Sequence, residues 1–255
     1  MKIKVTIKIS ILQRNVAGFA GKLTANSIYS RQMTDSKRAI VLLSGGLDSA
    51  TCLAIARSQG LSVYALSFSY SQKHSAELQC AKFLAQHYQV AEHKIITLDP
   101  SVFSGSSLVD KEMNIPKARD LSEMPLGIPS TYVPCRNALF LTYALAWAEV
   151  TKTNSIYIGV NALDYSGYPD CRPEFIAAFE NMANLASKIS TEGGQKVHIE
   201  APLQNLTKAE IAKLALELSV PVEHTLSCYD PTSDGKPCNE CDACILRAKG
   251  FESLI

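Results

Sequence analysis

An apolar run at residues 39–43 is followed at once by Ser-Gly-Gly-Leu-Asp-Ser, residues 44–49, and then by a helical pattern. This order predicts a buried strand, a glycine-bearing turn and a helix N-terminus, which together form a ready anion site. Gly45 and Gly46 leave room for backbone N–H groups to approach a phosphate, and Ser44, Ser49 and Thr51 add hydroxyls. The lysine and spacing of a Walker A loop are absent, which excludes an ordinary P-loop. A junction that needs glycine only for its geometry is the alternative.

Strand and helix signals alternate beyond this junction, which favours a parallel sheet with helices on both faces. We predict strands at 39–43, 62–67, 93–98, 155–160 and 197–201. Helices are expected at 49–59, 75–88, after Arg136, at 173–189, and from a capping box at Thr207 to about Leu218. Residues 99–131, with four prolines and little periodicity, are typical of a lid or binding loop. The predicted fold class is α/β, a Rossmann-like doubly wound parallel five-stranded sheet.

Polar segments follow four of the predicted strand and loop ends, at 44–49, 69–77, 134–137 and 161–172. Ligands of open α/β sheets bind outside the carboxyl ends of the strands, so these segments are expected to share one active site. Arg136 stands in the first turn of a helix, where a cation is disfavoured unless an anion compensates it. The candidate substrate-binding residues from these segments are Gln72, His74, Asn137, Asp164, Tyr168, Asp170 and Arg172. The nearby Cys171 is interpreted as a packing residue and not as a nucleophile.

Charge is unevenly distributed along the 255 residues. Residues 1–34 hold six basic residues and no acid, which leaves 19 of the 25 basic residues against all 24 acidic ones in the rest. Such a body is a poor electrostatic match for nucleic acid. The most apolar segment, 138–150, is shorter than the ~20 residues that a membrane span needs. We therefore expect no membrane and no nucleic-acid partner.

Four of the eight cysteines cluster near the C-terminus, as Cys228, Cys238, Cys241 and Cys244. The two x2 spacings suit a closed tetrahedral zinc site that would fold this small tail. An iron–sulfur cluster is the competing interpretation, but Ala248 stands where the fourth cysteine of a ferredoxin run would be. The expected division is an N-terminal extension over residues 1–36, an α/β domain over 37–225 and a zinc module over 226–255. A reducing, cytoplasmic location fits these thiols.

The motif S-G-G-x-D-S resembles the pyrophosphate loop of the N-type ATP pyrophosphatases. With S-G-Y-P-D-C-R-P-E-F at 166–175, V-P-C-R-N at 133–137 and the four-cysteine tail, residues 37–251 resemble the 7-cyano-7-deazaguanine synthases of queuosine biosynthesis. Ser71 departs from the glycine that is usual in this family. The resemblance implies conversion of 7-carboxy-7-deazaguanine, ammonia and ATP to the nitrile, through an adenylated carboxylate and an adenylated amide.

The resemblance also implies roles for particular residues. Asp48 would lie near magnesium, and Lys208 would point at the ATP phosphates. The expected catalytic residues are Asp48, Ser49, Lys208 and Arg136. The expected ATP-binding residues are Leu43, Ser44, Gly45, Gly46, Leu47, Asp48, Ser49, Ala50, Thr51, Cys52 and Leu53.

Two other functions stay open from the sequence. The chain could be a pyrophosphatase that modifies a tRNA base, or a zinc-containing nucleic-acid-binding regulator without catalysis. The expected cofactors are one structural zinc and ATP with magnesium, and a homodimer is compatible with the sequence.

Overall fold

Five parallel strands form the sheet, in the order β3–β2–β1–β4–β5. Their bounds are β1 Arg38–Leu42, β2 Ser62–Ser69, β3 Glu92–Thr97, β4 Ser155–Tyr157 and β5 His198–Glu200. The chain moves outward from β1 in one direction to β3 and then crosses back to β4. The strand order therefore reverses between β1 and β4, which is where such folds bind ligands. The computed structural model describes residues 37–70, 75–110, 112–118, 127–162 and 167–254. The predicted extension over residues 1–36 lies outside them.

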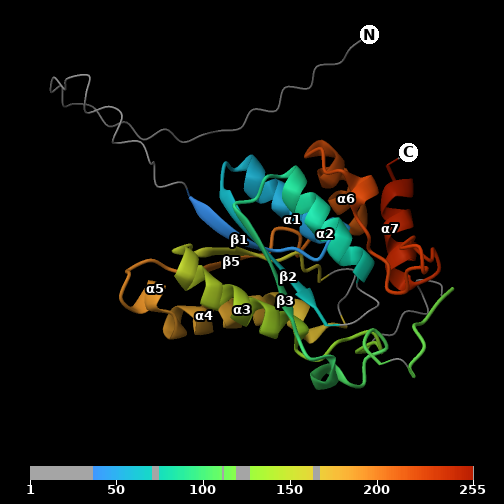
Figure 1. Cartoon of the computed structure of the whole chain (residues 1–255), viewed down its shortest axis with the longest axis horizontal. Helices are drawn as coiled ribbons and strands as arrows, with labels where there is room; N and C mark the ends of the chain where they lie inside the picture. The colour runs from blue at the N-terminus through green and yellow to red at the C-terminus, as the bar shows by residue number, and fades with distance from the viewer. Residues whose placement is uncertain (1–36, 71–74, 111, 119–126, 163–166, 255) are drawn as a thin grey trace, which may run out of the picture. The chain divides into compact units, whose positions relative to one another are not determined.

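Helices cover both faces of this sheet, so the predicted fold class is confirmed (Figure 1). The longer helices are α1 Leu47–Ser58, α2 Ser75–His87, α3 Arg136–Thr151, α4 Pro173–Ala186, α6 Lys208–Glu217 and α7 Asp242–Glu252, with one short turn α5 at Lys188–Thr191. Short 3-10 turns lie at η3 Pro100–Phe103, η5 Pro169–Cys171 and η6 Val222–His224.

Alternate residues of the strands face opposite layers, as the period of two requires. Val41 belongs to the same buried cluster as Leu53, Leu84 and Ile211 of α1, α2 and α6. Its neighbour Ile40 belongs to the second cluster, which includes side chains of α3 and α4. The cysteines Cys228, Cys241 and Cys244 are part of this second cluster. The C-terminal segment therefore shares its buried surface with the sheet layer, and residues 36–255 form one compact unit.

Two predicted elements differ from the observed ones, and one observed helix was not predicted. The predicted helix over 173–189 is interrupted at Ser187, which is extended (φ −91°, ψ 143°), and α5 follows. There the backbone N–H of Lys188 donates to Glu149 of α3, a tertiary contact that no local pattern reveals. The predicted strand over 155–160 ends at Tyr157. Helix α7 was not predicted at all.

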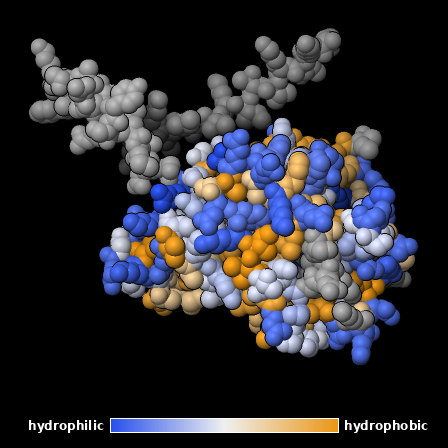
Figure 2. Space-filling model, in the orientation of Figure 1, coloured by the Kyte–Doolittle hydropathy of each residue, from blue (hydrophilic) through white to orange (hydrophobic). Residues whose placement is uncertain are grey.

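Hydrophilic residues cover most of the face seen in Figure 2, and a hydrophobic group lies near its centre. Exposed large apolar side chains among the described residues include Ile95 of β3, Val150 of α3 and Leu185 of α4. Apolar atoms are common on protein surfaces, so scattered side chains of this kind need no partner. Among the described residues, no helix combines the length and apolarity that crossing a membrane requires.

Candidate active site

The turn after β1 gathers backbone N–H groups around two serine hydroxyls. The N–H groups of Ser44 and Gly45 donate to Ser49 Oγ at 3.2 and 3.3 Å, and that of Gly46 donates to Ser44 Oγ at 3.2 Å. Gly46 is the N-cap of α1 and supplies no side-chain acceptor. Donors and a helix N-terminus thus converge on one point, which is the electrostatic requirement for binding a phosphate.

Two glycines let neighbouring elements approach this turn. Gly45 has φ +98°, and a Cβ there would lie 2.1 Å from the carbonyl oxygen of Glu77 in α2. A Cβ on Gly159, just after β4, would lie 3.0 Å from the Asp48 carbonyl carbon and the Ser49 nitrogen. Any larger residue would push α2 or the end of β4 away from the turn. The glycines therefore fix where the start of α1 lies between β1 and β4.

Asp48 and Lys208 form an ion pair beside the turn. Lys208 Nζ lies 3.0 and 2.8 Å from the two carboxylate oxygens, and the side chains are only 21% and 11% exposed for Asp48 and Lys208. Lys208 is the first residue of α6, whose predicted capping box between Thr207 and Glu210 is present. A cation at a helix N-terminus opposes the helix dipole, so a carboxylate or a phosphate must compensate it. The pair places one positive and one negative group at the N-terminus of α1.

A cavity opens above the carboxyl ends of the strands and connects this turn to an aromatic end. There the rings of Phe68 and Phe140 stack with their centroids 3.9 Å apart, and Arg136 Nη1 donates to the Tyr70 hydroxyl at 3.3 Å. The cavity lining includes Ser44, Asp48, Ser49, Tyr70, Arg136, Asn137, Tyr168, Lys208, Ser227, Tyr229, Ala243 and Arg247. The cavity thus offers backbone donors and Lys208 at one end, and flat rings together with Arg136 at the other.

The predicted substrate residues divide into three groups. Asn137 and Tyr168 line the cavity, and the Tyr168 hydroxyl pairs with Thr131 Oγ1 at 2.7 Å. Asp170 is buried behind Asn137 and Arg172 is exposed, and neither belongs to the cavity lining. Gln72, His74 and Asp164 lie outside the described residues.

Asp170 accepts a backbone hydrogen bond at the N-terminus of α3. Its Oδ2 accepts from the Asn137 backbone N–H at 2.8 Å, and Asn137 Nδ2 donates to the Asp170 carbonyl at 3.2 Å. Cys135, the N-cap of α3, is left-handed (φ 50°) and gives no side-chain cap, so Asp170 replaces it. Burial raises the pKa of Asp170, and the Asn137 N–H and nearby Arg136 oppose that shift. This carboxylate therefore orients the helix that presents Arg136.

The predicted ATP-binding segment is only partly exposed to the cavity. Leu43, Ser44, Gly46, Leu47, Asp48 and Ser49 line it. Gly45 does not line it, and Ala50, Thr51, Cys52 and Leu53 are buried behind the first turn of α1. The Thr51 hydroxyl donates to the Leu47 carbonyl at 2.8 Å and is used inside the helix.

The four clustered cysteines fit a metal. Their Sγ atoms all lie within 4.8 Å of one another, close to the ~3.8 Å edge of a tetrahedron with ~2.3 Å zinc–sulfur bonds. The backbone N–H of Cys238 donates to Cys228 Sγ at 3.2 Å, and that of Tyr229 to Cys241 Sγ at 3.4 Å. Such donors stabilise thiolates, the form that binds metal. Contacts with the Cys228 and Cys244 thiols lower the pKa of Cys241.

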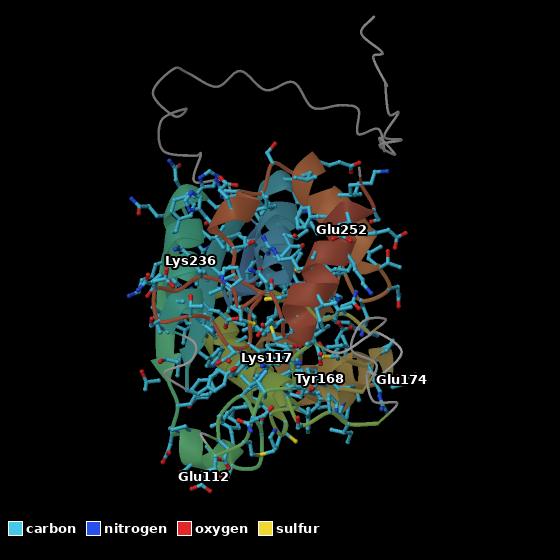
Figure 3. All side chains as sticks on the ribbon, turned by 90° about the vertical axis from the view of Figure 1, so that its right-hand side faces the viewer. Glu112, Lys117, Tyr168, Glu174, Lys236 and Glu252 are labelled. Atoms are coloured by element: carbon cyan, nitrogen blue, oxygen red, sulfur yellow. The ribbon has the colours of Figure 1, made fainter. Side chains whose placement is uncertain are left out.

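The loop before α3 attaches to this cluster. Lys117 forms an isolated bridge with Cys241, and its Nζ lies 2.9 Å from Asp230. Figure 3 views the molecule from the side that carries α7. Lys117 and the cavity residue Tyr168 are labelled there. The segment over 99–131 therefore joins the four-cysteine segment at this point.

The C-terminal segment supplies four cavity residues that sequence reasoning missed. They are Ser227, Tyr229, Ala243 and Arg247. Ser227 Oγ accepts from the Leu47 N–H at 3.2 Å, and the Leu226 N–H donates to the Gly45 carbonyl at 3.0 Å. Only their place in the sequence could have indicated a role in the site, since three of these residues directly neighbour Cys228 or Cys244.

A parallel sheet with an anion-binding turn at its switch point, and a ring-lined cavity beside it, define a nucleotide-binding α/β enzyme. The model of the queuosine biosynthesis protein QueC matches residues 38–255, and the chain belongs to this family.

Curated relatives extend over nearly all of the same region. A 7-cyano-7-deazaguanine synthase of Desulfatibacillum aliphaticivorans is 54% identical over 215 residues, which cover 84% of this chain and 92% of the relative. One of Nitrosospira multiformis is 57% identical over 216 residues, 85% of this chain and 91% of the relative. Among solved structures, NMN synthetase of Francisella tularensis aligns with a TM-score of 0.45 at 22% identity, covering 80% of this chain and 71% of that chain.

Proposed function

We propose that this enzyme converts 7-carboxy-7-deazaguanine, ammonia and ATP into 7-cyano-7-deazaguanine, the reaction that its relatives are named for. The observation that carries the proposal is the single cavity that joins the serine–glycine turn to the aromatic end with Arg136. One end suits a triphosphate, and the other suits a flat heterocycle with a carboxylate. Both reactants would then lie within one enclosed space.

In the first half-reaction, a carboxylate oxygen of the substrate attacks the α-phosphorus of ATP. The bond from that phosphorus to the β-phosphate oxygen breaks, and pyrophosphate leaves with the electron pair. Ammonia then adds to the acyl carbon, and AMP leaves with one proton lost to water, which gives the amide. The protein's task is to hold both reactants and to stabilise the developing charge.

In the second half-reaction, the amide oxygen attacks the α-phosphorus of a second ATP. Pyrophosphate leaves again. The nitrogen then loses two protons as the carbon–oxygen bond to AMP breaks, and the nitrile forms. Adenylation thus turns an oxygen that is a poor leaving group into part of AMP at both stages.

The described residues suit these tasks. The N–H groups at Ser44–Gly46 and the start of α1 would bind the pyrophosphate oxygens in place of the serine hydroxyls. Lys208 would contact the phosphates from the α6 side. Arg136, for which the described residues provide a tyrosine hydroxyl and no ion pair, would accept the substrate carboxylate. Tyr70 and Tyr168 would lie against the heterocycle.

Two metal ions complete the proposal. The four cysteines would hold one structural zinc, which would fix the C-terminal segment and take no part in bond making. Magnesium would neutralise the ATP phosphates, and Asp48 is the carboxylate of the turn that could hold it.

The test is product analysis with the purified full chain. With 7-carboxy-7-deazaguanine, ammonium and magnesium ATP, we expect the nitrile together with two AMP and two pyrophosphate per product. AMP release that depends on tRNA and not on the free heterocycle would instead support a tRNA-modifying enzyme. No ATP turnover with either substrate would contradict both.

A further inference from the structure

Arg247 of α7 lines the cavity, and its hydrogen bonds to the described residues go to neutral acceptors. Its Nη1 donates to Thr225 Oγ1 and its Nη2 to the Val222 carbonyl, both at 2.8 Å. The guanidinium carbon lies 5.5 Å from the centre of the Phe251 ring. These contacts hold the guanidinium in place without pairing it to a carboxylate.

Among the described residues, no carboxylate forms an ion pair with Arg247, whereas Lys208 in the same cavity is paired with Asp48. Burial lowers the pKa of Arg247, and attraction to Asp48 and to the Cys244 and Cys80 thiols partly opposes that shift. A half-buried cation that forms no direct ion pair is stabilised further by a ligand that supplies a negative charge. The cavity therefore contains a positive group that is oriented in advance for an anion.

The anchoring contacts connect Arg247 to the phosphate end of the cavity. Thr225, its hydrogen-bond acceptor, directly precedes Leu226, whose N–H donates to the Gly45 carbonyl at 3.0 Å. One helical turn beyond Arg247, a Cβ on Gly250 would lie 2.9 Å from Lys208 Cγ. Arg136, in contrast, is hydrogen-bonded to Tyr70 at the aromatic end.

We propose that Arg247 binds the β- and γ-phosphates of ATP and stabilises the departing pyrophosphate. The proposal rests on the function proposed above, because it assigns a residue to the leaving group of both adenylations. As the bond between the α-phosphorus and the bridging oxygen breaks, negative charge increases on the β-phosphate. The two N–H edges of a planar guanidinium match two phosphate oxygens better than an ammonium does. Arg247 would thus act on the group that leaves, while Arg136 acts on the group that attacks.

The test measures binding of inorganic pyrophosphate, of α,β-methylene-ATP and of AMP to the full chain by calorimetry, with magnesium present. Arg247→Gln should weaken pyrophosphate and α,β-methylene-ATP by about tenfold or more, as expected for one lost charge-assisted hydrogen bond. AMP lacks the two outer phosphates, so its affinity should change less than twofold. Lys249→Gln removes the same charge from an exposed position of α7 and serves as the matched control, with no change expected.

Equal loss for AMP and pyrophosphate, or pyrophosphate affinity within twofold of the unmodified protein, would overturn the assignment. If Arg247→Gln does not fold, Arg247→Lys decides, because it keeps the charge and should still weaken pyrophosphate but not AMP. If the unmodified protein makes the nitrile but Arg247→Gln leaves the affinity for pyrophosphate unchanged, this inference alone is refuted. Pyrophosphate binding that depends on Arg247 in a protein unable to make the nitrile would refute only the proposed function.

Discussion

Gly250→Ala tests whether α7 positions the active-site cations. In the present structure, a Cβ on Gly250 would lie 2.9 Å from both Lys208 Cγ and the Lys208 carbonyl oxygen. Ordinary contact begins at 3.4 Å, so α7 and α6 would have to separate by about 0.5 Å. Because Lys208 is the first residue of α6 and reaches Asp48 across the cavity, that shift moves Lys208 directly.

The expected effects on stability and activity differ in size. Alanine favours the helix by up to about 1 kcal/mol over glycine, whereas the overlap costs about 1–3 kcal/mol. The net destabilisation is about 0–2 kcal/mol, or a fall of about 0–8 °C in Tm for a chain of this size. A 1 Å misplacement at a catalytic group can reduce the rate about 100-fold, so a shift of about 0.5 Å should reduce it about tenfold.

The assay compares kcat/KM for ATP with Tm in two variants of the same helix. Ala248→Gly changes an exposed position and should lower Tm by about 2–4 °C through helix propensity, with activity unchanged. Gly250→Ala should lower activity about tenfold, with a fall in Tm inside the range given above. Gly250→Ala with unchanged kcat/KM, or Ala248→Gly with an equal loss, would refute the coupling between α7 and Lys208.

Three further predictions address single groups. Asp48→Asn should abolish AMP formation, measured by chromatography, while the protein stays folded. The reason is that Lys208 would lose its counter-charge and the proposed magnesium ion would lose its carboxylate ligand. Near-normal AMP formation by a folded variant would remove Asp48 from the mechanism. Cys241→Ser should lose zinc, measured by elemental analysis, because a neutral hydroxyl replaces a buried thiolate; iron with sulfide in the unmodified protein would contradict a zinc site. Burial raises the pKa of Cys171 to about 12. Iodoacetamide at pH 8 should therefore label the exposed Cys135 well before Cys171, as followed by peptide mass spectrometry. The reverse order of labelling would contradict the burial of Cys171.

The local features of the sequence predicted much of the fold. The apolar run and the Gly-Gly turn gave β1 and the start of α1, and the spacing of Thr207 and Glu210 gave the capping box of α6. These features depend on neighbours within a few residues, so one sequence is enough to reveal them. Helix α7 escaped prediction because it begins inside the cysteine cluster, with Cys241 as its N-cap and Cys244 in its first turn, so the metal-ligand spacing dominates its pattern.

Contacts between distant residues could not be predicted in the same way. Asp48 and Lys208 were each expected near phosphate, but 160 residues separate the two partners of the ion pair. Asp170 was expected to bind the heterocycle, whereas the structure uses it to cap α3, 33 residues earlier in the chain. Both cases depend on which helix starts meet at the sheet edge. That arrangement follows from strand order and packing, which no single motif encodes.

The same packing explains how a structural metal at the four cysteines, as proposed above, would act on the catalytic cavity. Ser227 and Tyr229 flank Cys228, and Ala243 precedes Cys244, so adjacent side chains of one backbone face the thiolate cluster and the cavity in turn. Arg247 lies one helical turn after Cys244, and Gly250 one turn further contacts Lys208. Fixing the four sulfurs would therefore fix the positions of groups at the phosphate end to within the tolerance that catalysis requires. A metal that contacts no reactant can then control the rate through the backbone that it holds.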